Sequence, residues 1–185
     1  MIPGGSGILR HLCRPVPARR GVLTWITSNK LMSGTEKTRI KKTPIEDKGV
    51  LCEAYDYAKK VSFVRGMRVE LDNCVMLFIS GTASLNEEGE SIHPGDINAQ
   101  TRRTFNNITG LLNSEGADWH DVVRTTCYLA DFRYYDEFNE VRNAFYAEQK
   151  LDPLPASTCI EARICRPELL VEIEAIAMIP KDRPQ

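Results

Sequence analysis

Two segments of this chain have apolar residues at helical spacing, and each lies between two runs of β-type residues. In the first, apolar side chains recur from Ile97 to Leu112, Asp96 stands at the N-cap position and Gly116 stands where a left-handed C-terminal cap belongs. In the second, Asp131 precedes the helix, and the predicted buried stripe consists of Tyr135, Phe138, Val141 and Phe145. The pattern predicts two helices, each connecting one strand to the next.

Five predicted strands complete the order β-β-α-β-α-β-β, at residues 61–71, 75–83, 122–130, 156–164 and 169–178. Right-handed crossovers place both helices on one face of a mixed sheet, so the fold class is α/β of the α+β kind. The other face would carry apolar residues, and association with further copies of the chain is the natural way to cover it. The last two strands are predicted to form a hairpin that turns at Arg166.

The composition is typical of one globular domain: 185 residues, of which 42% are hydrophobic and 26% are charged. No apolar run approaches the ~20 residues that a membrane span needs, so no membrane partner is expected. The formal net charge of -1 gives no footprint for nucleic-acid binding. The domain is assigned to residues 61–180, after a flexible lead-in at 32–60 that is rich in Lys and Glu.

Residues 1–31 contain five basic residues and no acidic one, which leaves 19 basic against 25 acidic residues in the remainder. Such a leader can be a transit peptide, and the protein would then be mitochondrial or lie in another organelle. However, Pro3, Pro15 and Pro17 interrupt the amphipathic helix that a transit peptide needs. The alternative is a disordered extension before a start at Met32, in a cytoplasmic protein. Both interpretations stay open.

The six cysteines are scattered along the chain, without a Cys-x-x-Cys pair and without a His at ligand spacing in the domain. The sequence therefore predicts neither a metal site nor a disulfide framework. Reduced thiols fit this distribution best.

Five segments resemble the Rid family of reactive-intermediate (enamine/imine) deaminases, in the family's order. Residues 78–82 resemble its "ISG" strand, 100–108 its first helix, 123–131 its "VVKTTVYLxD" strand, 138–141 its "FNxVY" helix and 171–177 its "EIEAIA" ending. The resemblance implies a chorismate-mutase-like fold and a homotrimer with small-molecule sites in the clefts between subunits. It also implies hydrolytic deamination of an enamine, an imine or a related metabolite, without metal or organic cofactor.

The resemblance implies roles for individual residues. Glu172 falls at the position of the Glu that helps to activate the water attacking the imine carbon, whereas Ser157 replaces the Arg of the "PARS" motif that grips the substrate carboxylate. Cys159 is interpreted as lining the cleft, not as a nucleophile, because no His or helix N-terminus is predicted near it. The other residues predicted to bind substrate are Phe63, Ser80, Gly81, Thr82, Asn139, Glu161 and Arg163.

Glu161 and Glu172 would lie opposite each other in a simple register of the closing hairpin. Two close carboxylates raise one pKa and suit general acid–base catalysis. The alternative for Glu172 is a solvated acid on an alternating strand.

The replacement by Ser157 leaves open which cation would pair with a substrate carboxylate in a partly dry pocket. Arg163 is six residues further along the strand, roughly 20 Å away at about 3.3 Å per residue, which one side chain cannot bridge. It could serve another end of the cleft or a neighbouring subunit, and Arg65 and Arg68 are further candidates.

An enzyme is the first functional hypothesis. The alternative is a non-catalytic, metabolite-binding or regulatory trimer that has lost deaminase activity together with the arginine. A third hypothesis, endoribonuclease activity or translation inhibition, is disfavoured by the acidic body of the chain and its lack of a basic patch.

Overall fold

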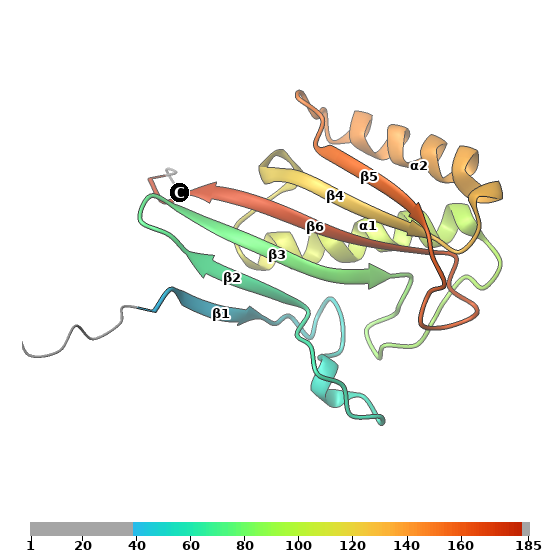
Figure 1. The fold of residues 1–185 in the computed structure, drawn as a ribbon, viewed down its shortest axis with the longest axis horizontal. Coiled ribbons are helices and arrows are strands. Elements are labelled where there is room, and N and C mark those ends of the chain that lie inside the picture. The colour runs from blue at the N-terminus through green and yellow to red at the C-terminus, as the bar shows by residue number, and fades with distance from the viewer. Residues whose placement is uncertain (1–38, 183–185) are drawn as a thin grey trace, which may run out of the picture. The chain divides into compact units, whose positions relative to one another are not determined.

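The computed structural model describes residues 39–182, which form one mixed sheet with two helices on one of its faces (Figure 1). The strand order is β1-β2-β3-β6-β4-β5, and all neighbours are antiparallel except the parallel pair β4–β5. The strands are β1 Lys41–Ile45, β2 Gly66–Glu70, β3 Cys74–Ala83, β4 Val122–Leu129, β5 Ala156–Glu161 and β6 Val171–Pro180. The predicted α+β class with two helices on one face is confirmed.

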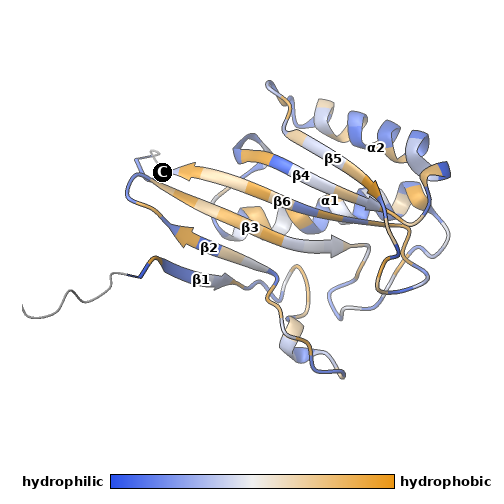
Figure 2. Cartoon of the chain, in the orientation of Figure 1, coloured by the Kyte–Doolittle hydropathy of each residue, from blue (hydrophilic) through white to orange (hydrophobic). Residues whose placement is uncertain are grey.

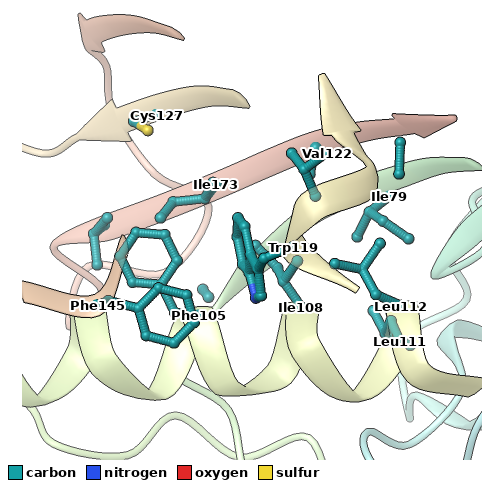
Figure 3. Close-up of a cluster of buried hydrophobic side chains, with 14 of the residues drawn as sticks. Ile79, Phe105, Ile108, Leu111, Leu112, Trp119, Val122, Cys127, Phe145 and Ile173 are labelled. Carbon is teal, nitrogen blue, oxygen red and sulfur yellow. The ribbon is translucent and has the colours of Figure 1, made fainter. Parts of the chain in front are cut away.

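Helix α1 (Ile97–Ser114) connects β3 to β4, and its predicted ends are confirmed. The Asp96 carboxylate accepts a hydrogen bond of 2.9 Å from the Ala99 amide, and Gly116 has a φ of +71°, in the left-handed region that favours glycine. The buried face of α1 packs on the sheet. On this face, Phe105 stacks on Phe145 of the second helix, with ring centroids 4.6 Å apart (Figure 3).

Helix α2 (Tyr135–Glu148) connects β4 to β5 and begins one turn later than predicted. Asp131 accepts a hydrogen bond from the Arg133 amide and so caps a short 3-10 turn, Phe132–Tyr134, that precedes the helix. In the predicted stripe, Phe138 and Phe145 are buried, Val141 is half-buried and Tyr135 is exposed. Tyr146, next to Phe145 near the C-terminal end of α2, is buried although the predicted stripe did not include it.

The sheet begins earlier in the chain than the sequence indicated. Strand β1 lies within the predicted flexible lead-in and pairs with β2. Ile45, the last residue of β1, and Leu51, which follows it, are fully buried. These isolated apolar residues have no strand or helix periodicity around them, which is why the pattern missed them. Residues 61–65, predicted as strand, lie outside β2.

The closing hairpin is wrong, because β4 lies between β5 and β6. Alternate residues of β6, from Val171 to Ile179, are buried, which suits a central strand. By contrast, every residue of β5 except Cys159 is exposed, which suits an edge strand. The hairpin was expected because the two strands are consecutive in the sequence.

Strands β3 and β6 contain many hydrophobic residues (Figure 2). On the face opposite the helices, Phe78 and Met178 alternate with core residues of β3 and β6 and are 38% and 40% exposed, and Ile160 of the edge strand β5 is 42% exposed. Exposed apolar side chains on one face of a sheet are typical of a surface that another protein covers. Neither α1 nor α2 is long and apolar enough to cross a membrane.

Candidate functional site

A cavity of about 700 Å³ lies where the bent ends of β3 and β6 meet the loops around residues 57–63 and 165–169. Four of the predicted site residues line it: Phe63, Ser80, Gly81 and Glu172. Tyr57 and Arg166 also line it, and the sequence analysis missed both because they lie in loops without periodicity.

A β-bulge shapes the wall of this cavity. The pairing of β3 with β6 shifts between Ile79 and Thr82, so that Ser80 and Gly81 bend away from the regular ladder. Ser80 is held there, since its amide donates to the Arg65 carbonyl at 3.0 Å and its hydroxyl to the Val64 carbonyl at 2.7 Å. Thr82 is buried and donates its hydroxyl proton to the Ser80 carbonyl at 2.9 Å, so it supports the bulge instead of lining the cavity.

Glu172 lies on the face of β6 that points away from the helices, between the buried residues Val171 and Ile173. Its pKa is raised, first because burial disfavours the charged carboxylate and second because the negative charge of Glu174 lies two residues along the same face. Within residues 39–182, no side chain forms an ion pair with Glu172 and no group donates a hydrogen bond to it. A half-buried, unpaired carboxyl with a raised pKa is suited to exchange a proton with a ligand.

The rings of Tyr57 and Phe63 form an aromatic wall of the cavity, and Arg65 packs behind them. It is only 4% exposed, and its guanidinium donates to the Cys52 carbonyl and, at 2.6 Å, to the Tyr57 hydroxyl. It also lies 5.1 Å from the Tyr57 ring centroid and 5.9 Å from that of Phe63. Arg65 therefore holds the wall and has little capacity left for a ligand.

Arg68 and Arg166 also have partners within the chain. Arg68 pairs with Glu115 at 3.0 Å, away from the cavity. Arg166 lines the cavity, 5.7 Å from the Tyr57 ring centroid, but donates to the Gly89 carbonyl and the Ser91 hydroxyl.

Glu161 and Arg163 line a second cavity, of about 430 Å³, beside the turn after β5. Glu161 accepts a hydrogen bond of 2.9 Å from the Phe132 amide at the start of the 3-10 turn. The predicted pairing of Glu161 with Glu172 is wrong, because β4 separates them: Leu129 pairs with Glu161, and Tyr128 with Glu172. The carboxylate next to Glu172 is Glu174.

Ser157 and Asn139 form a separate group on the helix side of the sheet, and Arg142 connects them. The Arg142 guanidinium donates to the Asn139 side-chain oxygen and lies 3.4 Å from the Ser157 hydroxyl oxygen. Ser157 in turn lies 3.0 Å from the Thr125 hydroxyl. Arg142 was missed by the sequence analysis, and the signal that could have found it is its position one turn after Asn139 on the same face of α2.

Cys159 belongs to this group and pairs in register with Cys127 of β4. Burial is the main cause that raises the pKa of both thiols. Both are therefore protonated near neutral pH and poor nucleophiles. The five cysteines among residues 39–182 are free, and no cluster of His, Cys, Asp or Glu in that range could hold a metal ion.

Apart from Thr82, and from Glu161 and Arg163 at the second cavity, the predicted site residues therefore fall into two groups that one chain does not bring together. Glu172, Ser80, Gly81 and Phe63 line the cavity at the end of β3 and β6. Ser157, Asn139 and Cys159 lie at the outer strand β5 and helix α2, on the opposite side of the sheet from Glu172.

Comparison with known proteins gives a consistent result. The model of the endoribonuclease L-PSP family matches residues 58–179. A RutC family protein from Pyrococcus abyssi is 36% identical over 101 residues, which are 55% of this chain and 76% of that protein. A RutC family protein from Pyrococcus horikoshii is also 36% identical over 101 residues, 77% of its length.

Solved structures share the fold. The YjgF gene product from E. coli superimposes with a TM-score of 0.59 at 28% identity, over 73% of this chain and 97% of that chain. E. coli TdcF, solved with bound serine, has a TM-score of 0.59 at 25% identity and the same two coverages. These neighbours have the chorismate-mutase-like fold. The family match covers most of the described domain, and the chain belongs to the endoribonuclease L-PSP family, also known as the Rid/YjgF family.

Proposed function

We propose that this protein hydrolyses small enamines or imines to carbonyl compounds and ammonia, with Glu172 as the acid–base residue. The observation that carries the proposal is the Glu172 carboxyl itself: it lines the 700 Å³ cavity, it has no ion-pair partner within residues 39–182, and its pKa is raised. Deamination by members of the Rid family supports the reaction type. The serine bound to TdcF is an amino acid, and so supports a ligand that carries both an amino group and a carboxylate.

The proposed reaction needs only proton transfers at one carboxyl. For an enamine, protonated Glu172 first gives its proton to the β-carbon, which produces the iminium form of the substrate. The carboxylate then takes a proton from water as the water oxygen bonds to the imine carbon. Glu172 returns this proton to the nitrogen. The carbon–nitrogen bond then breaks with its electrons going to nitrogen while the Glu172 carboxylate takes the proton of the new hydroxyl group, so that ammonia and the carbonyl product leave and Glu172 is protonated again.

The complete site is proposed to form between copies of the chain in a homotrimer. Two observations support this assembly: the two groups of site residues lie on opposite sides of the sheet, and the face that carries Glu172 also exposes Phe78, Ile160 and Met178. A neighbouring copy that covers this face could place its Ser157 group near the Glu172 cavity.

The test measures ammonia release from 2-imino acids and enamines generated in situ. Glu172→Gln keeps the shape of the side chain but cannot exchange the proton, so kcat should fall about a hundredfold or more. Glu88→Gln, in an exposed turn that does not line the cavity, is the control and should stay close to wild type. Equal rates for wild type and Glu172→Gln would refute the proposal.

The second candidate is a metabolite-binding trimer without catalysis, which the presence of Ser157 in place of the family's Arg favours. It predicts saturable binding of a 2-oxo acid without ammonia release from any substrate of the panel.

A further inference from the structure

Arg142 presents a guanidinium that is half-buried and has no acidic partner. Among residues 39–182, no carboxylate lies within 4.0 Å of it, whereas Arg102 and Arg133 on the same helical layer pair with Glu148 and Asp131. A cation that is partly removed from water without a counter-ion is unfavourable in the free protein and favours binding of an anion.

The guanidinium is also held in place. It lies 5.1 Å from the ring centroid of Phe138, one turn before it, and donates to the side-chain oxygen of Asn139. These contacts direct it towards β5, where Ser157 lies at 3.4 Å. Arginine has five N–H donors; the contacts with Asn139 and Ser157 use two of them, and the Cys127 thiol also interacts with the guanidinium. The remaining donors can bind a planar anion in the two-pronged geometry that guanidinium prefers.

The surroundings are neutral hydrogen-bonding groups, which suit an anion and do not compete with it. They are the hydroxyls of Thr125 and Ser157, which lie 3.0 Å apart, and the thiol of Cys159, whose pKa is raised by burial. Ser157 is small and leaves room beside the guanidinium. A longer side chain at this position would take the place of the ligand.

We propose that Arg142 is the carboxylate anchor of this protein and that the substrate is a 2-imino or 2-enamino carboxylic acid. The assignment of the substrate class rests on the proposed deamination, but the anchor itself does not. Arg142 binds the carboxylate of the substrate from helix α2, and Ser157 and Asn139 position the guanidinium. Because Ser157 stands on β5 where the family motif has an Arg, the positive charge comes instead from Arg142 of helix α2.

The test is binding of 2-oxobutanoate, a stable analogue of a 2-imino acid, to the full chain by isothermal titration calorimetry. Arg142→Gln keeps much of the side chain's length but removes its charge, so Kd should rise about tenfold or more. Arg142→Lys should recover part of the affinity. Arg133→Gln removes an exposed guanidinium and should leave Kd within about twofold of wild type. The neutral amide 2-oxobutanamide should bind wild type and Arg142→Gln equally.

A second pair of variants tests the same idea with Arg142 intact. Ser157→Asp places a carboxylate beside the guanidinium, which should weaken binding of 2-oxobutanoate about tenfold or more by occupying Arg142 from within. Asn143→Asp adds the same charge at an exposed position of α2 outside the proposed anchor and should bind as wild type does. This pair carries the test if Arg142→Gln does not fold.

The proposal is overturned if wild type does not bind 2-oxobutanoate, or if the Kd of Arg142→Gln and of Ser157→Asp stays within about twofold of wild type. These results are separate from those on catalysis. Binding that depends on Arg142 without ammonia release supports the anchor and refutes the deaminase. Ammonia release with a KM that Arg142→Gln does not change supports the deaminase and refutes the anchor.

Discussion

The carboxylate of Glu172 occupies the space that a side chain at Gly81 would need. A Cβ built at Gly81 would collide with the Glu172 Oε1 and would lie 2.9 Å from its Cδ. The absence of a side chain in the bulge of β3 is therefore what allows Glu172 to lie against the cavity wall.

Gly81→Ala should displace the Glu172 carboxylate and destabilise the fold by about 1 kcal/mol or less, because the colliding atoms are the end of a flexible side chain that can move. Urea unfolding measures the loss, and the ammonia-release assay should show a lower kcat. The double variant with Glu172→Ala identifies the contact, because removing the carboxylate should remove most of the penalty of Gly81→Ala. If Gly81→Ala destabilises both backgrounds equally, the collision is with another group.

The raised pKa of Glu172 predicts a stability difference that depends on pH. The ordinary value is 4.5, and in the folded state the pKa is higher, mainly because of burial. Between these two values the native protein binds more protons than the unfolded one, so the free energy of unfolding falls as pH rises through this window. In Glu172→Gln, the free energy of unfolding does not fall in this way, because the glutamine does not titrate. Its stability relative to wild type should therefore be higher at about pH 8 than at about pH 4.

Urea unfolding of wild type and Glu172→Gln at both pH values measures this difference. A difference in stability that is the same at both pH values would contradict a raised pKa in the folded state. The pH dependence of kcat/KM should show a limb in the same window, because the reaction needs both protonation states of Glu172.

The helices and the order of the elements from β2 onward were predictable because their signals are local. Asp96 caps α1 with its own side chain, and Gly116 ends it through its own backbone freedom, so neither depends on distant parts of the chain. The pairing of the strands was not predictable in this way. Alternation in β6 shows which residues face the core, but not that β6 lies between β3 and β4.

The residues of the candidate site show the same difference between local signals and contacts that form only in the folded chain. Resemblance to family segments pointed to Gly81 and Glu172, which line one cavity. It could not point to Arg142 or Tyr57. Arg142 becomes relevant only once α2 packs beside β5, and Tyr57 only once Arg65 orients its hydroxyl across the loop. Contacts between elements, which no local pattern contains, determine both.

Arg65→Lys should lower stability by about 1–3 kcal/mol, since a lysine cannot donate to the Cys52 carbonyl and the Tyr57 hydroxyl and also stack on two rings. The wall of the cavity would loosen with it, so KM should rise more than kcat falls. The matched control is Arg68→Lys, a partly exposed ion-pair residue outside the cavity, which should change stability by less than about 1 kcal/mol. Equal effects of the two variants would mean that the contacts of Arg65 do not support the wall.

Phe78→Glu should dissociate the proposed trimer without unfolding the chain. Phe78 lies on the open face of the sheet and is 38% exposed in the single chain, so a charge there is tolerated in the monomer but is costly at an interface. Light scattering should give a trimer for wild type and a monomer for the variant, and ammonia release should be lost with the assembly. Phe132→Glu changes a similarly exposed aromatic residue in the turn before α2 and serves as control. A wild-type monomer would contradict the assembly.

Mixing two impaired variants should restore activity if each site takes Glu172 from one copy and Arg142 from the next. Trimers refolded from equal amounts of Glu172→Gln and Arg142→Gln chains contain sites at which both intact residues meet, about a quarter of the sites for random assembly. With substrate well below KM, ammonia release should therefore recover to about a quarter of the wild-type rate, whereas Glu172→Gln alone should keep about a hundredth or less and Arg142→Gln alone about a tenth or less. If both residues served a site within one chain, every chain in the mixture would lack one of them, and the mixture would show only the average rate of the two variants. The recovered rate thus distinguishes a site shared between copies from a site complete in one chain.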